Sequence, residues 1–249
     1  MDTTWLPGLL QLTDSFFPTG AYAHSFGLEG LVQEGTVTHA ASLRGFLLEA
    51  FLPALGATDL PIAALAWTTL GRVGGQGKEW ETGFDAEALK PEPDWNEVEE
   101  ICRRCAALKP SREPREASEN IGRQRLEMLR LLHPGGLAEA FAKETQARQW
   151  PIGAPVAAAL EGRVLGAPQS AVMAAVFYSS TAGMLAAAMK LVRIGQNTAQ
   201  SLLSEALTLA PPMLKSAAAL TLSETGSFNP WLDIAAARHE TADGRLFIS

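Results

Sequence analysis

Apolar residues recur every three or four positions along most of this chain, which is the spacing of helices that bury one face. The pattern is clear over residues 42–55, where Leu43, Phe46, Leu47 and Phe51 fall on one stripe. Similar stripes follow through the rest of the chain, and prolines and glycines separate them. No segment alternates apolar and polar residues with a period of two, the pattern of a half-buried strand. The sequence therefore predicts an all-α fold, a single compact bundle of about nine or ten helices.

One of these predicted helices has no charged side chain over residues 171–189. The length is enough to span a bilayer, but seven of the residues are alanine and three hydroxyl residues occupy the middle. A helix that is apolar on all sides also fits the centre of a bundle, so we expect a buried central helix rather than a membrane span. Its small residues would let another helix backbone come close; they are Ala182, Gly183, Ala186 and Ala187.

Two segments lack the helical pattern. Residues 72–95 are polar and rich in glycine, proline and acidic side chains, which predicts a flexible insertion between helices. Residues 226–249 begin with Gly226 and Pro230 and contain only short apolar pairs after them, so we expect a tail that packs on something rather than a core helix. The predicted organisation is a helical domain over residues 1–225 followed by this tail.

The balance of acidic and basic residues bears on which kinds of partner the protein can bind. Among 249 residues, 27 are acidic and 20 are basic, which gives a net charge of −7 and argues against nucleic-acid binding. The first ten residues lack the basic stretch and the long apolar run of a secretory signal. Two cysteines are too few for a disulfide framework. We therefore expect a cytoplasmic protein that binds neither nucleic acid nor a membrane.

The motifs that usually carry cofactor or metal chemistry are incomplete in this chain. Residues 74–78 read GGQGK, but Arg72 and Glu79 stand where a phosphate loop needs glycine and a hydroxyl residue. Cys102 and Cys105 have the spacing of half a zinc site without a second pair, so we interpret them as two small buried apolar residues, with a transient metal contact as the alternative. No histidine has a glutamate three residues before it. None of these motifs therefore identifies a catalytic, cofactor-binding or metal-binding residue.

One alternative stays open near the start of the chain, where a carboxylate, two serines and a histidine lie within sixteen residues. An enzyme with a buried site in the helical bundle would use His24 and Glu29, or the cysteine pair. Asp14, Ser15 and Ser25 are equally good local hydrogen-bonding residues for turns and caps. On that second interpretation the segment is a corner that holds two helices together.

Three blocks of the sequence, taken together, resemble the UreF family of urease accessory proteins. Residues 12–29 look like its N-terminal signature, of the form Asp-Ser-x-x-Pro-x-Gly followed by Ser-x-Gly-Leu-Glu. The matching residues are Asp14, Ser15, Pro18, Gly20, Ser25, Gly27, Leu28 and Glu29. Residues 186–203 are similar to the segment after the family's central helix through Leu191, Gly195 and Gln196. The C-terminal match consists of Asp233, Ile234, Arg238, His239, Glu240, Arg245, Leu246 and Phe247.

The resemblance implies an all-α homodimer with no catalysis and no cofactor of its own. Its partners would be a UreD/UreH-type accessory protein and then the GTPase UreG. The assembly would act on apo-urease so that nickel is delivered and the active-site lysine is carbamylated. The nucleotide would belong to the GTPase, which fits the missing phosphate loop. In the structural corner, Pro18 and Gly20 would shape the chain, while Ser25 and Glu29 would satisfy helix-end amides or a partner.

The C-terminal match makes the tail the predicted docking element for the UreD/UreH-type partner. Its apolar residues need burial, and its charged residues can make charge-assisted contacts. We expect the tail to be mobile in the isolated protein and to become ordered on that partner. The alternative is a structural strap that packs on its own bundle.

Overall fold

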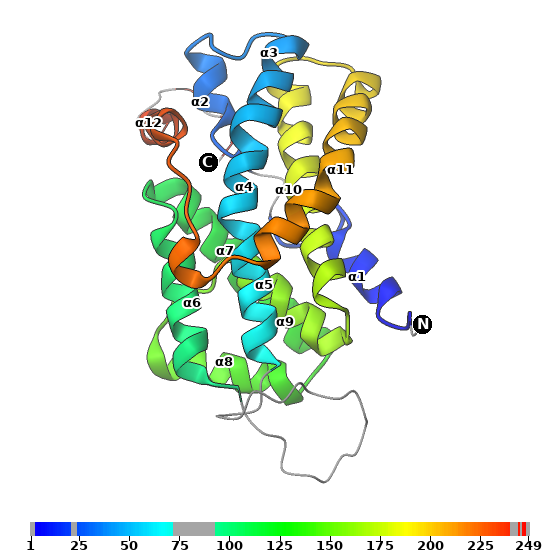
Figure 1. Ribbon diagram of the computed structural model, residues 1–249, viewed down its shortest axis with the longest axis vertical. Coiled ribbons are helices and arrows are strands. Elements are labelled where there is room, and N and C mark those ends of the chain that lie inside the picture. The colour runs from blue at the N-terminus through cyan, green and yellow to red at the C-terminus, as the bar shows by residue number, and fades with distance from the viewer. Residues whose placement is uncertain (1–2, 21–23, 72–92, 240–243, 245, 248–249) are drawn as a thin grey trace.

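Figure 1 shows a computed structural model of the chain, an elongated bundle of helices. No strand occurs among the residues that the structure describes, which confirms the predicted all-α fold. Most of the predicted insertion at 72–95 lies outside the described residues, as do Glu240 and Arg245 of the tail. The described residues are 3–20, 24–71, 93–239, 244 and 246–247.

The described part of the chain forms twelve labelled α-helices. In chain order they are α1 (Leu6–Thr13), α2 (Leu28–Gln33), α3 (Ala40–Gly45), α4 (Leu52–Ala57), α5 (Asp59–Leu70), α6 (Trp95–Ala107), α7 (Arg112–Leu132), α8 (Gly136–Arg148), α9 (Ala154–Leu165), α10 (Gln169–Leu191), α11 (Gln196–Ala218) and α12 (Pro230–His239). A π-helical turn, η2 (Phe46–Phe51), joins α3 to α4, and a 3₁₀ turn, η3 (Leu222–Glu224), precedes α12. Because α3, η2, α4 and α5 run on as one rod, the twelve labels reduce to ten helices, in agreement with the predicted number.

The rod from Ala40 to Leu70 widens where the π-helical turn meets a proline. Pro53, in the first turn of α4, cannot donate a backbone hydrogen bond, and its ring would crowd the carbonyl four residues earlier in a regular helix. The preceding turn is opened, because the backbone N–H of Leu52 donates to the carbonyl of Leu47, five residues back. The rod therefore continues past the proline without a break.

The core consists of two apolar clusters that α5 connects. One cluster lies between α2, the α3–α4 rod, α10 and α11, and the other between α6, α7, α8 and α9, toward the opposite end of the molecule (Figure 1). Leu60 and Ala63 of α5 belong to the first cluster, whereas Ile62 and Leu70 belong to the second. Since one helix contributes to both, the two clusters are parts of one packed body.

The predicted central helix is α10, and ten of its 23 residues are buried. Phe177, Met184 and Ala188 have no exposed surface. Two stretches, Ala40–Leu70 and α10, are long and apolar enough to cross a membrane by length and composition alone. About half of each most apolar window is buried inside the fold (50% and 56%), which is how a core helix of a bundle also behaves.

The predicted close helix contact at the small residues of α10 is wrong for Gly183. A Cβ at this position would lie 3.5 Å from the ring of Phe26, an ordinary contact with a side chain rather than with a helix backbone. A close backbone approach occurs instead at Gly30 of α2, where a Cβ would lie 2.6 Å from the carbonyl oxygen of Ala235 in α12. Spacing alone does not tell which neighbour a small residue faces.

The tail contains a helix that the sequence interpretation missed. Pro230 does not interrupt a helix here, because it occupies the first position of α12, where its missing N–H would have no helical partner in any case. Asn229 precedes it, and its side-chain oxygen accepts a hydrogen bond from the backbone N–H of Leu232 at 3.2 Å, as a cap does. The new helix packs against α2 and α7 (Figure 1). The described tail therefore lies on its own bundle.

Candidate functional site

The C-terminal tail meets the N-terminal signature in a buried group that we call the carboxylate–histidine cluster: Glu29 of α2, Glu113 of α7 and His239 of α12. The Nε2 atom of His239 lies 2.9 Å from Glu29 Oε2, and its Nδ1 atom lies 2.8 Å from Glu113 Oε2. All three residues are buried. Three helices far apart in the sequence are thus held together through one imidazole ring.

Glu29 also binds the last described residues of the chain. Its Oε1 atom accepts a hydrogen bond from the backbone N–H of Leu246 at 2.7 Å, and its Oε2 atom accepts one from that of Phe247 at 3.0 Å. The ring of Phe247 is buried and lies beneath the ammonium of Lys190 in α10, 5.4 Å from the ring centroid. Both oxygens of this buried carboxylate therefore have donors, as burial of a charged group requires.

Local geometry in the signature brings Glu29 to this position. The hydroxyl of Ser25 accepts a hydrogen bond from the backbone N–H of Glu29 at 3.3 Å, which supports the start of α2. Gly27 adopts a left-handed conformation (φ +80°) just before the helix, and a Cβ there would lie 2.7 Å from Leu232 of α12. Leu28 is fully buried in the first apolar cluster. Each of these signature residues serves the contact with the tail.

The first half of the signature forms a turn after α1. Asp14 ends this helix, and its side chain accepts a hydrogen bond from the backbone N–H of Phe16 at 2.7 Å. Gly20 has a positive φ of +73°, whereas Ser15 and Pro18 are exposed. This arrangement supports the expected corner for Asp14 and Gly20, and it gives no contact that would assign a role to Ser15.

The tail presents a second set of residues to solvent. Four of its large apolar side chains are exposed, at 94% for Phe228, 63% for Trp231, 51% for Ile234 and 74% for Leu246. Asp233 is exposed as well, and Arg238 forms a surface ion pair with Glu34 of α2 at 2.8 Å. The predicted tail residues therefore divide into a buried pair, His239 and Phe247, and a group that faces outward.

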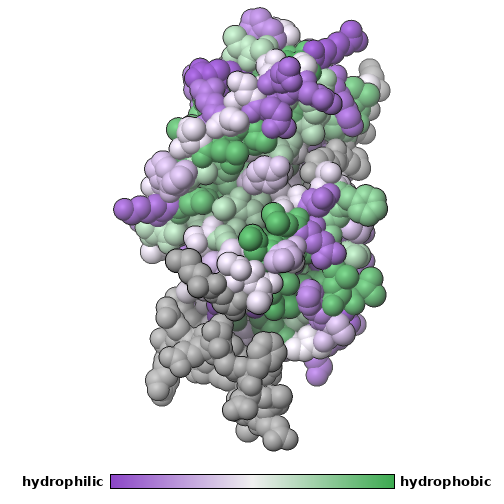
Figure 2. Space-filling view, turned by 90° about the vertical axis from the view of Figure 1, so that its right-hand side faces the viewer, coloured by the Kyte–Doolittle hydropathy of each residue, from purple (hydrophilic) through white to green (hydrophobic). Residues whose placement is uncertain are grey.

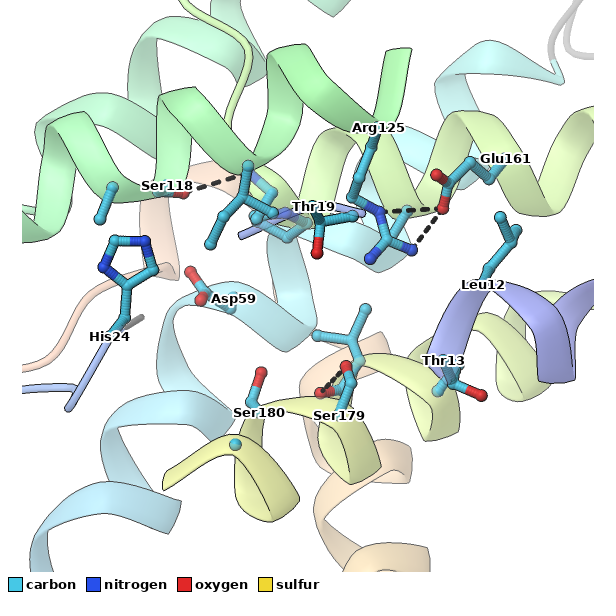
Figure 3. Close-up of a pocket in the computed structure, with 18 of the residues that line it drawn as sticks. Leu12, Thr13, Thr19, His24, Asp59, Ser118, Arg125, Glu161, Ser179 and Ser180 are labelled. Atoms are coloured by element: carbon cyan, nitrogen blue, oxygen red, sulfur yellow. Dashed lines mark hydrogen bonds and ion pairs between the residues drawn. The ribbon is translucent and has the colours of Figure 1, made fainter. Parts of the chain in front are cut away.

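A cavity of about 140 Å³ lies on the other side of the signature, between α1, α5, α7, α9 and α10 (Figure 3). Its walls are mostly apolar, and two ion pairs reach them. Arg125 of α7 donates from Nε to Glu161 Oε2 of α9 at 3.0 Å, and Lys109 lies 2.5 Å from Asp59. The second oxygen of Glu161 is buried and has no hydrogen-bond partner among the described residues. Burial raises the pKa of this carboxyl.

The structure does not bring His24 and Glu29 together as an enzyme site would require. His24 lines the cavity at the end opposite Glu161 (Figure 3), and burial lowers the pKa of its imidazole. Glu29 is instead occupied by the tail. The hydroxyls of Ser118 and Ser179 in the cavity wall bind backbone groups rather than a base. The alternative interpretation of this segment as a catalytic site is therefore wrong.

The cysteine pair does not supply the alternative chemistry either. Cys102 and Cys105 are buried in the second apolar cluster. Burial raises the pKa of the Cys102 thiol well above its usual value and that of Cys105 to about 12, so both remain protonated and unreactive. Among the described residues, no group of three or more histidine, cysteine or acidic side chains is arranged to hold a metal ion.

The sequence analysis singled out Glu29 and His239 of the carboxylate–histidine cluster, but not Glu113. Glu29 and His239 stood out in separate blocks, without any sign that they touch. Glu113 lies in the first turn of α7, where an acidic residue usually needs no explanation beyond its favourable interaction with the helix N-terminus. No local pattern marks it as a partner of a histidine 126 positions away.

Comparison with known proteins places these features in a family. A family model described as UreF matches residues 37–207. The chain is 31% identical over 247 residues to the urease accessory protein UreF of Dechloromonas aromatica, covering 98% of this chain and 97% of that protein. It is 30% identical over 234 residues to that of Azorhizobium caulinodans (94% and 90% covered) and 29% identical over 241 residues to that of Arthrobacter sp. strain FB24 (97% and 96% covered).

These matches extend over the signature and the tail as well as the bundle, since the relatives cover nearly the whole chain. They confirm the prediction of an accessory protein rather than an enzyme. The family assignment also explains why neither the cavity nor the cysteine pair contains catalytic geometry. On the matched region and the full-length relatives together, the chain belongs to the UreF family of urease accessory proteins.

Proposed function

We propose that this chain is a non-catalytic component of a urease-maturation assembly in the cytoplasm. It binds a UreD/UreH-type accessory protein, and the pair then recruits the GTPase UreG and acts on apo-urease during nickel insertion. The family membership and the resemblance of the signature and tail support this role. The proposal assigns the nucleotide to the GTPase and treats nickel as cargo.

The observation that carries the proposal is the outward face of the tail. Phe228, Trp231, Ile234 and Leu246 expose large apolar surfaces within a short segment of the chain. Grouped exposed apolar side chains mark interaction surfaces, and tryptophan is among the residues that contribute most to binding energy. The outward residues of the tail are therefore the proposed docking surface for the UreD/UreH-type partner.

The buried contacts of the tail favour docking through a surface that is already ordered, rather than through a mobile segment. His239 and Phe247 pack on the bundle, which favours the alternative of a structural strap for this half of the tail. A strap and a docking element are compatible, because different residues do the two tasks. The partner would then meet a largely preformed surface, and little ordering entropy would oppose binding.

A double substitution on the outward face tests this proposal. We expect Trp231→Ala with Ile234→Ala to weaken binding of the UreD/UreH-type partner at least about 30-fold, as loss of about 2 kcal/mol from a hot spot does. The measurement is titration calorimetry with the two purified proteins. The melting temperature should stay close to that of the wild type, because both side chains are exposed.

Leu131→Ala is the matched control, since Leu131 is as exposed as the tail residues but lies at the end of α7. It should leave binding unchanged. Binding at full strength by the double variant, or by a chain that lacks residues 226–249, would reject the tail as the docking element.

The proposed assembly contains two copies of this chain. Apolar side chains of α1 and α11 remain exposed, namely Leu6, Leu10, Leu207 and Leu209. Figure 2 shows the side of the molecule on which these two helices lie, with apolar and polar areas intermixed. Light scattering across a dilution series should give twice the chain mass of 26.5 kDa. A monomer at every concentration would refute the homodimer.

A further inference from the structure

The imidazole of His239 lies between two carboxylates, and this arrangement determines how many protons the cluster holds. Each ring nitrogen lies within hydrogen-bond distance of a glutamate oxygen, Nε2 at 2.9 Å from Glu29 and Nδ1 at 2.8 Å from Glu113. An ionised carboxylate only accepts hydrogen bonds, and a neutral imidazole has only one N–H. A neutral ring between two ionised carboxylates would therefore direct one lone pair at an oxygen.

The remaining contacts of Glu29 favour its ionised form. Its oxygens receive the backbone N–H groups of Leu246 and Phe247 in addition to the ring. An added carboxyl proton would compete with these three donors for lone pairs. The cluster thus satisfies its hydrogen bonds when one extra proton lies on the ring of His239 or between the ring and Glu113.

The surroundings of the ring supply charges of both signs. From α2 come Glu29 and Glu34, and from α7 come Glu113 and its neighbour Arg112. Arg238 of α12 pairs with Glu34 at the surface, and Lys190 of α10 lies on the ring of Phe247. Of these described groups, the two carboxylates are the ones in direct contact with His239, and a ring proton offsets one of their two negative charges.

We propose that Glu29 and Glu113 are positioning residues for the docking tail, and that they hold it through the doubly protonated ring of His239. This inference rests on the proposed function, since it concerns the element assigned to partner binding. Loss of the proton leaves a lone pair facing a carboxylate, which loosens α12 and residues 246–247 from α2 and α7. Binding of the UreD/UreH-type partner therefore weakens at higher pH, where the ring loses this proton, at about tenfold in Kd per pH unit for one linked proton.

The two glutamates are expected to respond differently to the same substitution. In Glu113→Gln, the new amide can donate to Nδ1 while Nε2–H still donates to Glu29, so a neutral ring satisfies every contact. This variant should retain binding and lose the pH dependence between pH 6.5 and 8.5. In Glu29→Gln, the amide N–H₂ would face the N–H of Leu246 or Phe247, so binding should fall at every pH.

Glu34→Gln is the matched control at the C-terminal end of α2, because Glu34 makes a surface ion pair with Arg238 outside the cluster. It should keep both the affinity and the pH profile of the wild type. The measurement is calorimetry with the UreD/UreH-type partner in steps from pH 6.5 to 8.5. A flat profile in the wild type, or an equal slope in Glu113→Gln, would overturn the proposal.

A second measurement needs no partner. The chain has four histidines, so ring-nitrogen NMR spectra assigned with His239→Gln report the protonation of His239 directly. We expect both ring nitrogens protonated at pH 6.5, with the exchange protection of the Leu246 and Phe247 amides lost together with that proton at higher pH. A single neutral tautomer at pH 6.5 would refute the inference.

The two measurements also separate this inference from the proposed function. If a chain lacking residues 226–249 still binds the partner, the docking role fails, while the ring-nitrogen and amide data still decide whether the cluster holds its proton. If the tail is required for binding but the ring is neutral, the docking role stands and the positioning role fails.

Discussion

Two buried glutamates in this molecule differ in how fully their oxygens are used. Glu29 is 2% exposed and Glu161 is 1% exposed. Glu29 accepts hydrogen bonds at both oxygens, from His239 and from two backbone amides of the tail. Glu161 is bound by Arg125 at one oxygen only, and its other oxygen has no hydrogen-bond partner among the described residues.

The difference shows that burial alone does not describe the role of a charged group. At Glu29, the donors belong to α12 and to residues 246–247 of the tail, so the carboxylate fixes these segments to α2. At Glu161, the single donor comes from a helix that already packs against α9, and the cavity beside the pair has room for a few water molecules. Glu29 thus holds separate segments of the chain together, whereas Glu161 is bound within a pair of helices that already pack on each other.

The largest effect is expected from removing the positive charge that Arg125 places beside Glu161. Arg125→Leu leaves this carboxyl buried without a partner, which should lower the free energy of unfolding by about 3–5 kcal/mol. Urea denaturation at pH 8 measures the loss. The exposed pair of Arg130 and Glu139 gives the control, and Arg130→Leu should stay within the error of the measurement.

The same variant should be less impaired in mild acid. Burial raises the pKa of Glu161, so the folded state binds this proton more strongly than the unfolded chain does. Stability from the protonated form is then present at low pH and lost as the pH rises through the folded pKa. The deficit of Arg125→Leu should therefore be smaller at pH 5 than at pH 8, and an equal deficit would contradict this account.

The next effect compares the same substitution at the two glutamates. Glu29→Gln places an amide against donors that have no other acceptor, and should reduce the local stability of the tail by about 2–3 kcal/mol. Glu161→Gln keeps an amide oxygen for Arg125, and the cavity beside the pair has room for water that can hydrate this cation, so the loss should be about 1 kcal/mol or less. Hydrogen exchange at α12 and urea denaturation measure the two values. Equal losses would erase the contrast between the sites.

Two glycines give a further comparison, Gly30 of α2 next to Glu29 and Gly183 of α10 in the wall of the cavity that Glu161 also lines. Gly30→Ala brings a Cβ to 2.6 Å from the carbonyl of Ala235 and should push α12 outward, at about 1–3 kcal/mol. Gly183→Ala meets only the ring of Phe26 at 3.5 Å, and should stabilise the chain by about 0.5–1 kcal/mol because alanine favours the helix. Thermal melts show whether each substitution raises or lowers the stability. Destabilisation by Gly183→Ala would show that α10 is more tightly packed than the geometry indicates.

The sequence predicted those parts of the fold that depend on local pattern. The apolar stripe of residues 42–55 and the uncharged run of α10 indicate helices by spacing alone, and both are helical in the structure. The prediction failed where a neighbour decides the outcome. Gly183 has the spacing of a helix contact but faces Phe26, and Pro230 starts a helix because Asn229 caps it.

The candidate site was predictable only in pieces. The blocks around Glu29 and His239 stood out separately, but the ring and the carboxylate that meet are 210 positions apart, and no periodicity relates positions so distant. Glu113 has an ordinary place in the first turn of α7. What the sequence lacked was the packing of α12 on α2 and α7, which is a property of the whole fold.

The contact between Glu29 and residues 246–247 has a consequence for biosynthesis. The two backbone donors lie 217 and 218 positions after the carboxylate that accepts them, so a ribosome must add all the intervening residues before α2 acquires them. A product that stops before residue 246 has neither amide, and its α2 carries a carboxylate without these donors. Premature termination would therefore leave a loosened end that cellular proteases can attack, whereas a finished chain covers it.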